Sequence, residues 1–152
     1  MIELKNITFN YSSQVNGGLH NINLTIQNGE CILLCGCSGC GKTTITRLIN
    51  GLIPRFYSGD LEGDVLVDHK SVNDFPMYEL AEHIGSVFQN PRSQFFNVDT
   101  TSELAFGPEN HGIAEDLVRD RVKRVAAQLK LEPLLDRSIF SLSGGEKQRI
   151  SI

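Results

Sequence analysis

Residues 36–43 read GCSGCGKT, and this stretch decides the fold together with its two neighbours, CILLC (31–35) and KTTITRLINGL (42–52). The run before it is short and continuously apolar, which predicts a strand buried on both faces. The run after it has its apolar residues at helical spacing: Ile45, Leu48, Ile49 and Leu52. A strand, a glycine-rich turn and a helix in this order predict an α/β fold.

The stretch 36–43 matches the pattern G-x-x-x-x-G-K-[ST] at every fixed position. Glycines allow the bends by which backbone N–H groups converge on phosphate oxygens, and the next helix directs its positive end at the same phosphates. Lys42 would reach the β- and γ-phosphates, and the Thr43 hydroxyl would hold Mg²⁺. The alternative is an ordinary strand-to-helix turn. The predicted nucleotide-binding residues are Gly36, Cys37, Ser38, Gly39, Cys40, Gly41, Lys42, Thr43 and Thr44.

All four cysteines lie between residues 31 and 40, which raises a metal site as a second hypothesis. Cys35, Cys37 and Cys40 could supply three thiolates and Cys31 a fourth. In a strand, however, Cys31 and Cys35 would lie about 13 Å apart on one face and could not readily share an ion. The phosphate loop is therefore favoured. Cys37 or Cys40, if exposed near positive N–H groups, could still be redox-sensitive.

Length and composition exclude several classes of protein. A chain of 152 residues fits one domain. Its net charge of −4 offers no general attraction to nucleic acid or anionic lipid. The N-terminus lacks the features of a secretory signal, and no apolar run approaches the roughly 20 residues that cross a bilayer. The expected compartment is the cytosol.

Hydrophobic periodicity gives the remaining elements. Alternation predicts strands over 2–11 and 19–26, QNGE (27–30) reads as a turn, and further strands are expected at 64–68 and 84–88. Residues 114–131 have the pattern of an amphipathic helix that forms part of a core. Ser143 and Glu146 make the capping-box pattern S-x-x-E, so a helix should begin at Ser143. Ile152 comes only about two turns later, and we expect the chain to be truncated.

The motif LSGGE (142–146), together with the loop at 36–43, makes the chain resemble the ATP-binding domain of ABC-type transporters. The resemblance implies an α/β P-loop nucleotide hydrolase fold with an antiparallel β edge and a helical subdomain. Residues 1–152 would be a partial domain, with the nucleotide-binding core at 1–91 and the helical subdomain with the start of the signature helix at 92–152.

The resemblance also assigns roles outside the loop. Tyr11 stands where the family stacks an aromatic ring on adenine, although a strand tyrosine facing the core is an alternative. Gln89, in VFQNP, matches the glutamine that holds Mg²⁺ and senses the membrane partner. The signature residues meet the γ-phosphate held by an opposing domain, so that two domains enclose two ATP molecules. These residues are Ser143, Gly144, Gly145 and Glu146.

A finer resemblance lies in NGLIPRFYSGDLEGDVLVD (50–68) and FQNPRSQFFNVDTTSELAFGPEN (88–110). Both look like the ATPase components of energy-coupling-factor transporters, which import vitamins and transition-metal ions. The implied partners are a second ABC ATPase domain, a transmembrane coupling subunit and a substrate-binding membrane subunit, at the cytoplasmic face of the membrane, with no nucleic acid. His69 departs from the family, which mostly has glycine in that turn.

The family's remaining motifs would follow the signature: a buried strand ending in an aspartate, a catalytic glutamate and a histidine switch. They cannot be matched here, and the earlier histidines are expected at the surface: His20, His69, His83 and His111. We therefore expect the 152-residue chain alone to be unstable and nearly inactive. Two alternatives stay open, a non-transport ABC-type ATPase acting on ribosomes or DNA, and a non-catalytic nucleotide-binding fragment.

Overall fold

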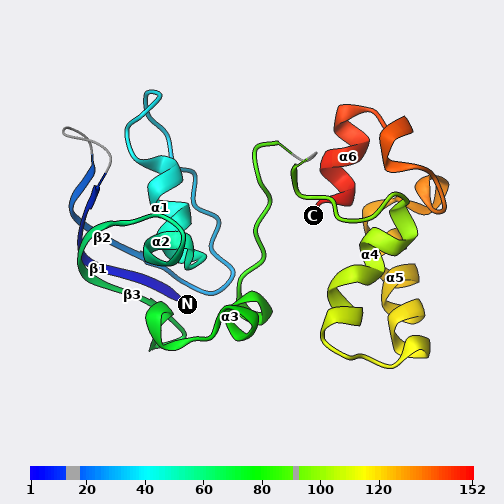
Figure 1. Ribbon diagram of the computed structural model, residues 1–152, viewed down its shortest axis with the longest axis horizontal. Coiled ribbons are helices and arrows are strands. Elements are labelled where there is room, and N and C mark those ends of the chain that lie inside the picture. The colour runs from blue at the N-terminus through cyan, green and yellow to red at the C-terminus, as the bar shows by residue number, and fades with distance from the viewer. Residues whose placement is uncertain (13–17, 91–92) are drawn as a thin grey trace. The chain divides into compact units, whose positions relative to one another are not determined.

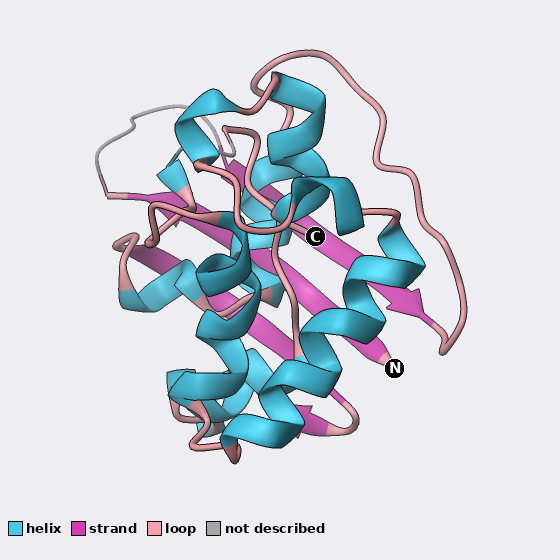
Figure 2. Ribbon diagram, turned by 90° about the vertical axis from the view of Figure 1, so that its right-hand side faces the viewer, coloured by secondary structure: helices cyan, strands magenta, loops and turns pink. Residues whose placement is uncertain are grey.

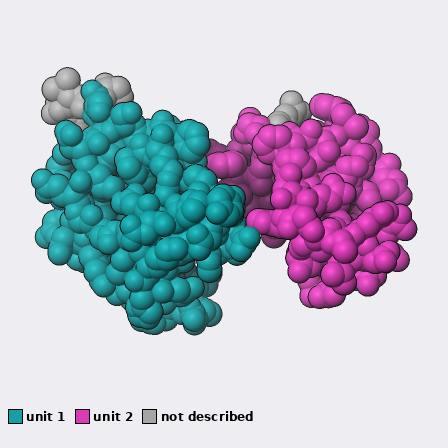
Figure 3. Space-filling view, turned by 60° about the horizontal axis from the view of Figure 1, so that its bottom comes forward, with its two compact units in different colours: residues 1–85 teal, residues 86–152 magenta. Residues whose placement is uncertain are grey.

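The computed structural model describes residues 1–12, 18–90 and 93–152, and it divides the chain into two compact units. Unit 1 comprises Met1–Gly85 and unit 2 comprises Ser86–Ile152 (Figure 3). Each unit has its own cluster of buried apolar side chains. Among the described residues, none of the helices combines the length and the apolar character that a membrane crossing requires.

Unit 1 is built on a four-stranded sheet in the order β2-β1-β3-β4, with every neighbouring pair antiparallel (Figure 1). The strands are β1 (Ile2–Tyr11), β2 (Gly18–Ile26), β3 (Gly59–Val67) and β4 (Lys70–Ser71). On β1, Leu4 faces Leu24 of β2 and Val65 of β3. The alternation that predicted β1 and β2 is thereby confirmed, as is the antiparallel sheet of the expected fold.

Helices cover one face of this sheet and close the core of unit 1 (Figure 1), and Figure 2 colours the helices and strands of the chain by type. They are α1 (Lys42–Ile49), α2 (Leu52–Arg55), the 3₁₀ turn η1 (Val72–Asp74) and α3 (Met77–His83). Phe9 and Ile7 of β1 are fully buried, and Leu48 of α1 is 1% exposed. Burying each such side chain contributes about 1.5–3 kcal/mol. The packing of α1 on the sheet therefore fixes the position of this helix, which begins where the glycine-rich loop ends.

Two predicted strands are not formed. Residues 31–35 and 84–88 are in no strand of the described sheet, and Leu33 is 83% exposed. A strand needs a neighbour for its N–H and C=O groups, and in parallel sheets that neighbour comes from a distant part of the sequence. The apolar run gives the side-chain pattern of a buried strand, but among the described residues no strand pairs with it. The prediction of strands at these two places was wrong for this structure.

The turn between β3 and β4 shows how the family's usual glycine is replaced. Val67 pairs with Lys70, so Asp68 and His69 are the two turn residues, with φ values of 47° and 70°. Two positive φ angles in a two-residue hairpin define a type I′ turn, for which Asp-Gly is among the preferred pairs. The tight turn therefore forms, and His69 adopts a conformation that costs an L residue about 1 kcal/mol.

Replacing His69 with glycine should stabilise the protein by about 0.5–1 kcal/mol, because glycine removes the strain of the positive φ. The substitution loses only a 3.9 Å contact between His69 Nδ1 and Glu3 Oε2, at an imidazole that is 79% exposed. Urea unfolding of wild type and His69→Gly measures the difference. His20→Gly, at an exposed position inside β2, is the control and should destabilise; a loss of stability in His69→Gly would contradict the turn assignment.

Unit 2 is helical and contains α4 (Thr100–Asn110), α5 (Glu115–Leu129) and α6 (Gly144–Ile150), with the 3₁₀ turns η3 (Glu132–Leu134) and η4 (Ile139–Ser141). Its core joins Ala126 of α5, Leu134 of η3 and Ile150 of α6. Val118 and Val122 of α5 are also buried. The predicted amphipathic helix and the core role of its apolar face are therefore confirmed.

Asp99 begins α4 as its N-cap, and its carboxylate accepts a hydrogen bond from Ser102 N at 2.9 Å. This bond to Ser102 lowers the pKa of Asp99. A carboxyl group whose pKa is lowered by folding stabilises the protein above its unfolded pKa, near 3.9, and the contribution is lost as the pH falls through the folded value. Asp99→Ala should cost about 1 kcal/mol at pH 7.

The same difference between wild type and Asp99→Ala should shrink as the pH falls below about 4, where the carboxylate of Asp99 takes up a proton. Urea unfolding at pH 7, 5 and 3 tests this. Asp116→Ala is the control, because Asp116 lies in the first turn of α5 without a capping bond among the described contacts. A difference that stays constant across this pH range would contradict the capping role of Asp99.

Candidate nucleotide-binding site

The glycine-rich loop leads directly into α1. Gly41 is the N-cap residue with a φ of 96°, a left-handed conformation that glycine adopts without strain. The conformation therefore requires glycine, and a Cβ at this position would in addition displace Leu19, whose Cδ2 would lie 2.6 Å away. A Cβ at Gly36 would lie 2.6 Å from Cys40 Sγ. The two fixed glycines of the motif therefore shape a loop whose end opens a helix, as predicted.

Lys42 spans this loop with its side chain. Its ammonium donates to the carbonyl of Gly36 at 2.8 Å and to that of Cys37 at 2.7 Å. An ammonium has three donors; these two bonds fix Nζ inside the curve of the loop, and the third donor is directed to Cys40 Sγ at 3.4 Å, a weak acceptor that an anion could replace. A phosphate held by the loop's N–H groups would meet this positive charge together with the positive end of α1. The loop thus has the donors and charge that phosphate binding requires.

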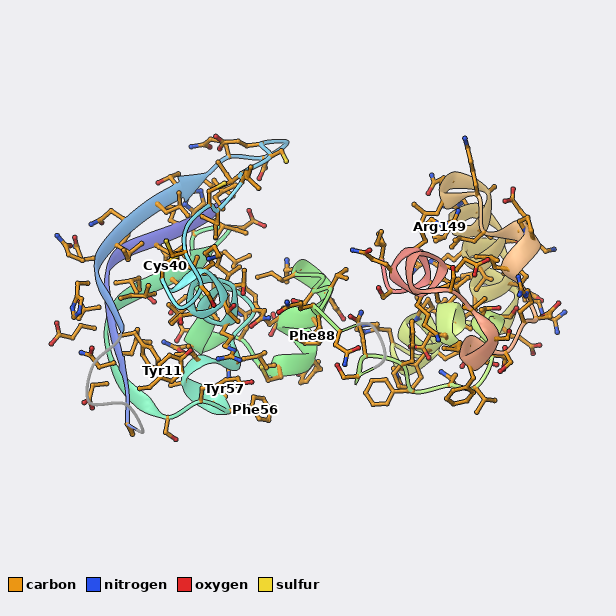
Figure 4. All side chains as sticks on the ribbon, turned by 90° about the horizontal axis from the view of Figure 1, so that it is seen from above. Tyr11, Cys40, Phe56, Tyr57, Phe88 and Arg149 are labelled. Atoms are coloured by element: carbon orange, nitrogen blue, oxygen red, sulfur yellow. The ribbon has the colours of Figure 1, made fainter. Side chains whose placement is uncertain are left out.

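Cys40 lies beside the same ammonium, with its Sγ 3.4 Å from Lys42 Nζ. All four cysteines are exposed and unpaired (Figure 4 labels Cys40). In residues 1–12, 18–90 and 93–152 no group of three or more His, Cys, Asp or Glu side chains is placed to hold a metal ion. The cysteine at position 40 is therefore the one whose modification would change the surroundings of Lys42 most directly.

Alkylation of Cys40 with N-ethylmaleimide should weaken ATP binding at least ~10-fold, because the adduct occupies the space beside the Lys42 ammonium and an interaction with a charged group is worth about 1.5–3 kcal/mol. Cys40→Ala should bind ATP normally and resist the reagent. Cys31→Ala, which removes an exposed thiol from the segment before the loop, should remain sensitive. If alkylated wild type bound ATP unchanged, the redox hypothesis for this cysteine would lose its basis.

Tyr11, the predicted adenine-stacking residue, ends β1 and is half-buried (Figure 4). Its hydroxyl lies 3.1 Å from Thr44 Oγ1 on α1 and accepts a hydrogen bond from Arg47 Nη1 at 3.2 Å. The rings of Phe9 and Tyr57 meet it nearly at right angles, with interplanar angles of 81° and 87°. These contacts fix the ring next to the helix of the phosphate loop. Stacking on adenine remains a prediction.

Arg47 and Tyr57 belong to this arrangement and were missed in the sequence. The Arg47 guanidinium lies 3.9 Å from the centroid of the Tyr57 ring, so one cation contacts both tyrosines. Arg47 follows Thr43 by one helical turn, and that spacing could have identified it as a residue near the loop. Tyr57 lies after α2 and carried no local signal, because its position depends on the packing of β1 and α1 around it.

The residues present fit a magnesium ion in their chemistry. Mg²⁺ takes oxygen ligands, and Thr43 and Gln89 each offer one. Both residues are exposed, and within the described part of the chain no side-chain hydrogen bond engages either oxygen. Thr43 lies in unit 1 and Gln89 in unit 2, so the two are placed by different parts of the fold. Their joint binding of the ion remains a prediction.

The signature helix α6 is capped as predicted. Ser143 Oγ accepts from Glu146 N at 3.3 Å, and Glu146 Oε2 accepts from Ser143 N at 2.7 Å, which completes the capping box. The bonds to Ser143 lower the pKa of Glu146, and Arg137, 3.7 Å away, adds to this. A Cβ built at Gly144 or Gly145 would meet nothing within 4 Å. Gly144 and Gly145 are both exposed, so the start of α6 leaves room for an anion.

The structure brings Tyr11, the glycine-rich loop and Thr44 together in unit 1, and it places Gln89 and the signature in unit 2. The four histidines are exposed, which confirms the expectation from the sequence. A glycine-rich loop with an enclosed lysine, followed by a helix that packs on a sheet, defines a P-loop nucleotide-binding protein. Within this class, the capped LSGGE helix is the feature that makes the chain resemble the ABC-type ATP-binding domains.

The family model of ABC transporters matches residues 19–152. The chain belongs to this family. It is 48% identical over 151 residues to a Treponema denticola protein named as an ABC transporter ATP-binding protein, covering 99% of this chain and 31% of that protein. A Pyrococcus abyssi protein of the same description is 38% identical over 152 residues, covering 100% of this chain and 54% of the relative.

Among solved structures the chain is similar to CbiO1 from Clostridium perfringens, described as part of the ABC transporter complex CbiONQ. The TM-score is 0.84 with 31% sequence identity, over 99% of this chain and 58% of CbiO1. The chain thus spans about a third to a little over half of these proteins. The resemblance to the ATPase component of energy-coupling-factor transporters is confirmed by this similarity.

Proposed function

We propose that the whole protein binds and hydrolyses ATP and thereby powers a membrane transporter. The observation that carries this proposal is the presence, in one chain, of a lysine-spanned phosphate loop and a capped LSGGE helix whose two glycines are exposed. The first can hold the phosphates of one nucleotide. The second is the surface with which the family contacts a nucleotide on an opposing domain.

Each of the predicted site residues would have a distinct role in ATP binding and hydrolysis. Lys42 neutralises phosphate charge and the loop N–H groups orient the β- and γ-phosphates, because phosphoryl transfer depends on positioning and charge neutralisation. The ring of Tyr11 would stack on the adenine of the bound nucleotide. Thr43 and Gln89 would hold Mg²⁺, which would supply further neutralisation of the phosphate charge. Ser143 and Gly145 of one domain close on the γ-phosphate of the other.

We further propose the class of transporter that the protein powers. Similarity to CbiO1 and the stretch LAFGPEN (104–110) both favour an energy-coupling-factor importer of a vitamin or a transition-metal ion. A second ABC ATPase domain, a transmembrane coupling subunit and a substrate-binding membrane subunit would complete it at the cytoplasmic face of the membrane. For the 152-residue chain alone we propose nucleotide binding with little turnover, since the catalytic glutamate of the family is not among its residues.

Purification of the natural full-length protein from detergent-solubilised membranes of its source cells tests the transporter role. We expect it to co-purify with a membrane-spanning protein, and its ATPase activity should be lost in Lys42→Ala while the association is kept. Recovery with ribosomes or DNA instead would favour the non-transport ABC-type ATPase. Binding of ATP without turnover by the natural protein would identify a non-catalytic nucleotide-binding protein.

A further inference from the structure

Two of the four cysteines lie inside the glycine-rich loop itself, three residues apart. Cys37 and Cys40 enclose Ser38 and Gly39 in the sequence C-S-G-C. This C-x-x-C spacing is the one at which redox-active proteins form a reversible disulfide. The loop is proposed to hold phosphate with backbone N–H groups, so neither thiol is needed for that contact, and both are exposed.

The backbone brings these two cysteines close together. Cys40 N donates a hydrogen bond to the Cys37 carbonyl at 3.3 Å, which closes a β-turn over residues 37–40. Gly39, the third residue of the turn, has a φ of 82°, as a type II turn requires at this position. The first and last Cα atoms of a β-turn lie less than about 7 Å apart, and disulfides usually span about 4.4–6.8 Å between Cα atoms. The turn is therefore compatible with a disulfide between its two ends.

The side chain of Cys40 is directed back toward the start of the loop. Its Sγ would lie 2.6 Å from a Cβ built at Gly36, the residue that precedes Cys37. The same Sγ lies 3.4 Å from the Lys42 ammonium, which is itself 2.7 Å from the Cys37 carbonyl. The Cys40 thiol is thus close to the backbone of the other cysteine of the pair.

The hydrogen bond across the turn determines what a disulfide would do to the loop. Phosphate binding needs the loop's N–H groups to converge on the ligand, whereas the N–H of Cys40 is bonded to the Cys37 carbonyl. At 3.3 Å this bond is longer than the usual range of about 2.7–3.2 Å, so the reduced loop can release the N–H to a nucleotide. A covalent bond between the same two residues would keep the turn closed and the N–H away from the phosphates.

We propose that Cys37 and Cys40 form a reversible disulfide that prevents the loop from binding ATP; this regulation rests on the proposed function, in which the loop holds the phosphates. One thiolate of the pair attacks a sulfur of a low-molecular-weight disulfide, and half of that molecule leaves as a thiolate. The second cysteine then displaces the other half, and the loop disulfide forms. The two cysteines are oxidised, and the external disulfide is reduced to two small thiols, which take up the protons that the cysteines lose.

The test treats the natural full-length protein with glutathione disulfide. In the Cys31→Ser, Cys35→Ser double variant, the loop pair supplies the only thiols of residues 1–152. Mass spectrometry of this region should show a disulfide between Cys37 and Cys40 and no retained glutathione. A further Cys37→Ser or Cys40→Ser substitution removes the second thiol, so each of these proteins should retain glutathione on the cysteine that is left.

The oxidised double variant should bind Mg·ATP at least ~10-fold more weakly than its own reduced form, because an N–H contact to a charged group is lost. Dithiothreitol should restore the affinity. The variant in which all four cysteines are serine is the control, and the same treatment should leave its affinity at its own untreated value. Wild type should show the same reversible loss, so the test does not depend on the folding of the double variant.

The chemical and the binding measurements separate this regulation from the proposed function. Glutathione retained on the double variant, pairing of either loop thiol with a different cysteine, or unchanged affinity for Mg·ATP in the oxidised form would overturn the disulfide proposal alone. Failure of the reduced wild type to bind Mg·ATP would overturn the proposed function of the loop, and the regulation with it, whether or not the disulfide forms.

Discussion

Replacing Lys42 with alanine should weaken the binding of Mg·ATP to the natural full-length protein by about 10–100-fold, because it removes a charged donor from the phosphates. The ammonium lies inside the loop, 2.8 Å from the Gly36 carbonyl and 2.7 Å from the Cys37 carbonyl. Its position is thus fixed before a nucleotide binds, and little ordering is needed on binding. Isothermal titration gives the affinity.

Lys5→Ala is the matched control for Lys42→Ala. Lys5 is an exposed lysine of β1 that contacts only Glu3 among the described acidic residues, at 3.3 Å. Its loss should leave ATP affinity within twofold, since an exposed ion pair far from the loop contributes little. Equal affinity of wild type and Lys42→Ala would show that the loop does not hold the phosphates.

Substituting Gly145 with aspartate should reduce ATP turnover by about 100-fold or more while ATP binding to the loop is kept. The added carboxylate would place a negative charge at the start of α6, which is proposed to stabilise charge on the γ-phosphate, and loss of one such stabilising contact typically costs 10²–10³ in rate. A Cβ at Gly145 meets nothing within 4 Å, so the fold should tolerate the change.

Gly145→Asn separates charge from size for this prediction. Asparagine has nearly the same volume without the charge, so it should retain more turnover than Gly145→Asp in the same phosphate-release assay. Thermal unfolding of both variants should match wild type. Turnover near the wild-type rate in Gly145→Asp would exclude a contact between α6 and a nucleotide.

Local sequence signals predicted the parts of the site that depend on nearby residues. The motif at 36–43 gave the loop and the start of α1, and the S-x-x-E pattern gave the capping box of α6, because each motif is satisfied by bonds over a few residues. Alternation gave β1 and β2 for the same reason, since it reflects the two faces of one strand.

Features that depend on distant residues were not predicted. The apolar run at 31–35 and the segment 84–88 have strand composition, but strand formation depends on a neighbour that the pattern does not specify. The contacts of Arg47 with Tyr11 and Tyr57 arise from packing between β1, α1 and the segment after α2.

Amide hydrogen exchange of the natural full-length protein with Mg·ATP and with Mg·ADP tests the central claim most directly. The account predicts that both nucleotides slow exchange in residues 36–44, whereas only ATP, which carries the γ-phosphate, also slows exchange at Gly144 and Gly145. Slower exchange in the loop with no difference at α6 between ATP and ADP would contradict the shared site. No change in either segment would contradict nucleotide binding itself.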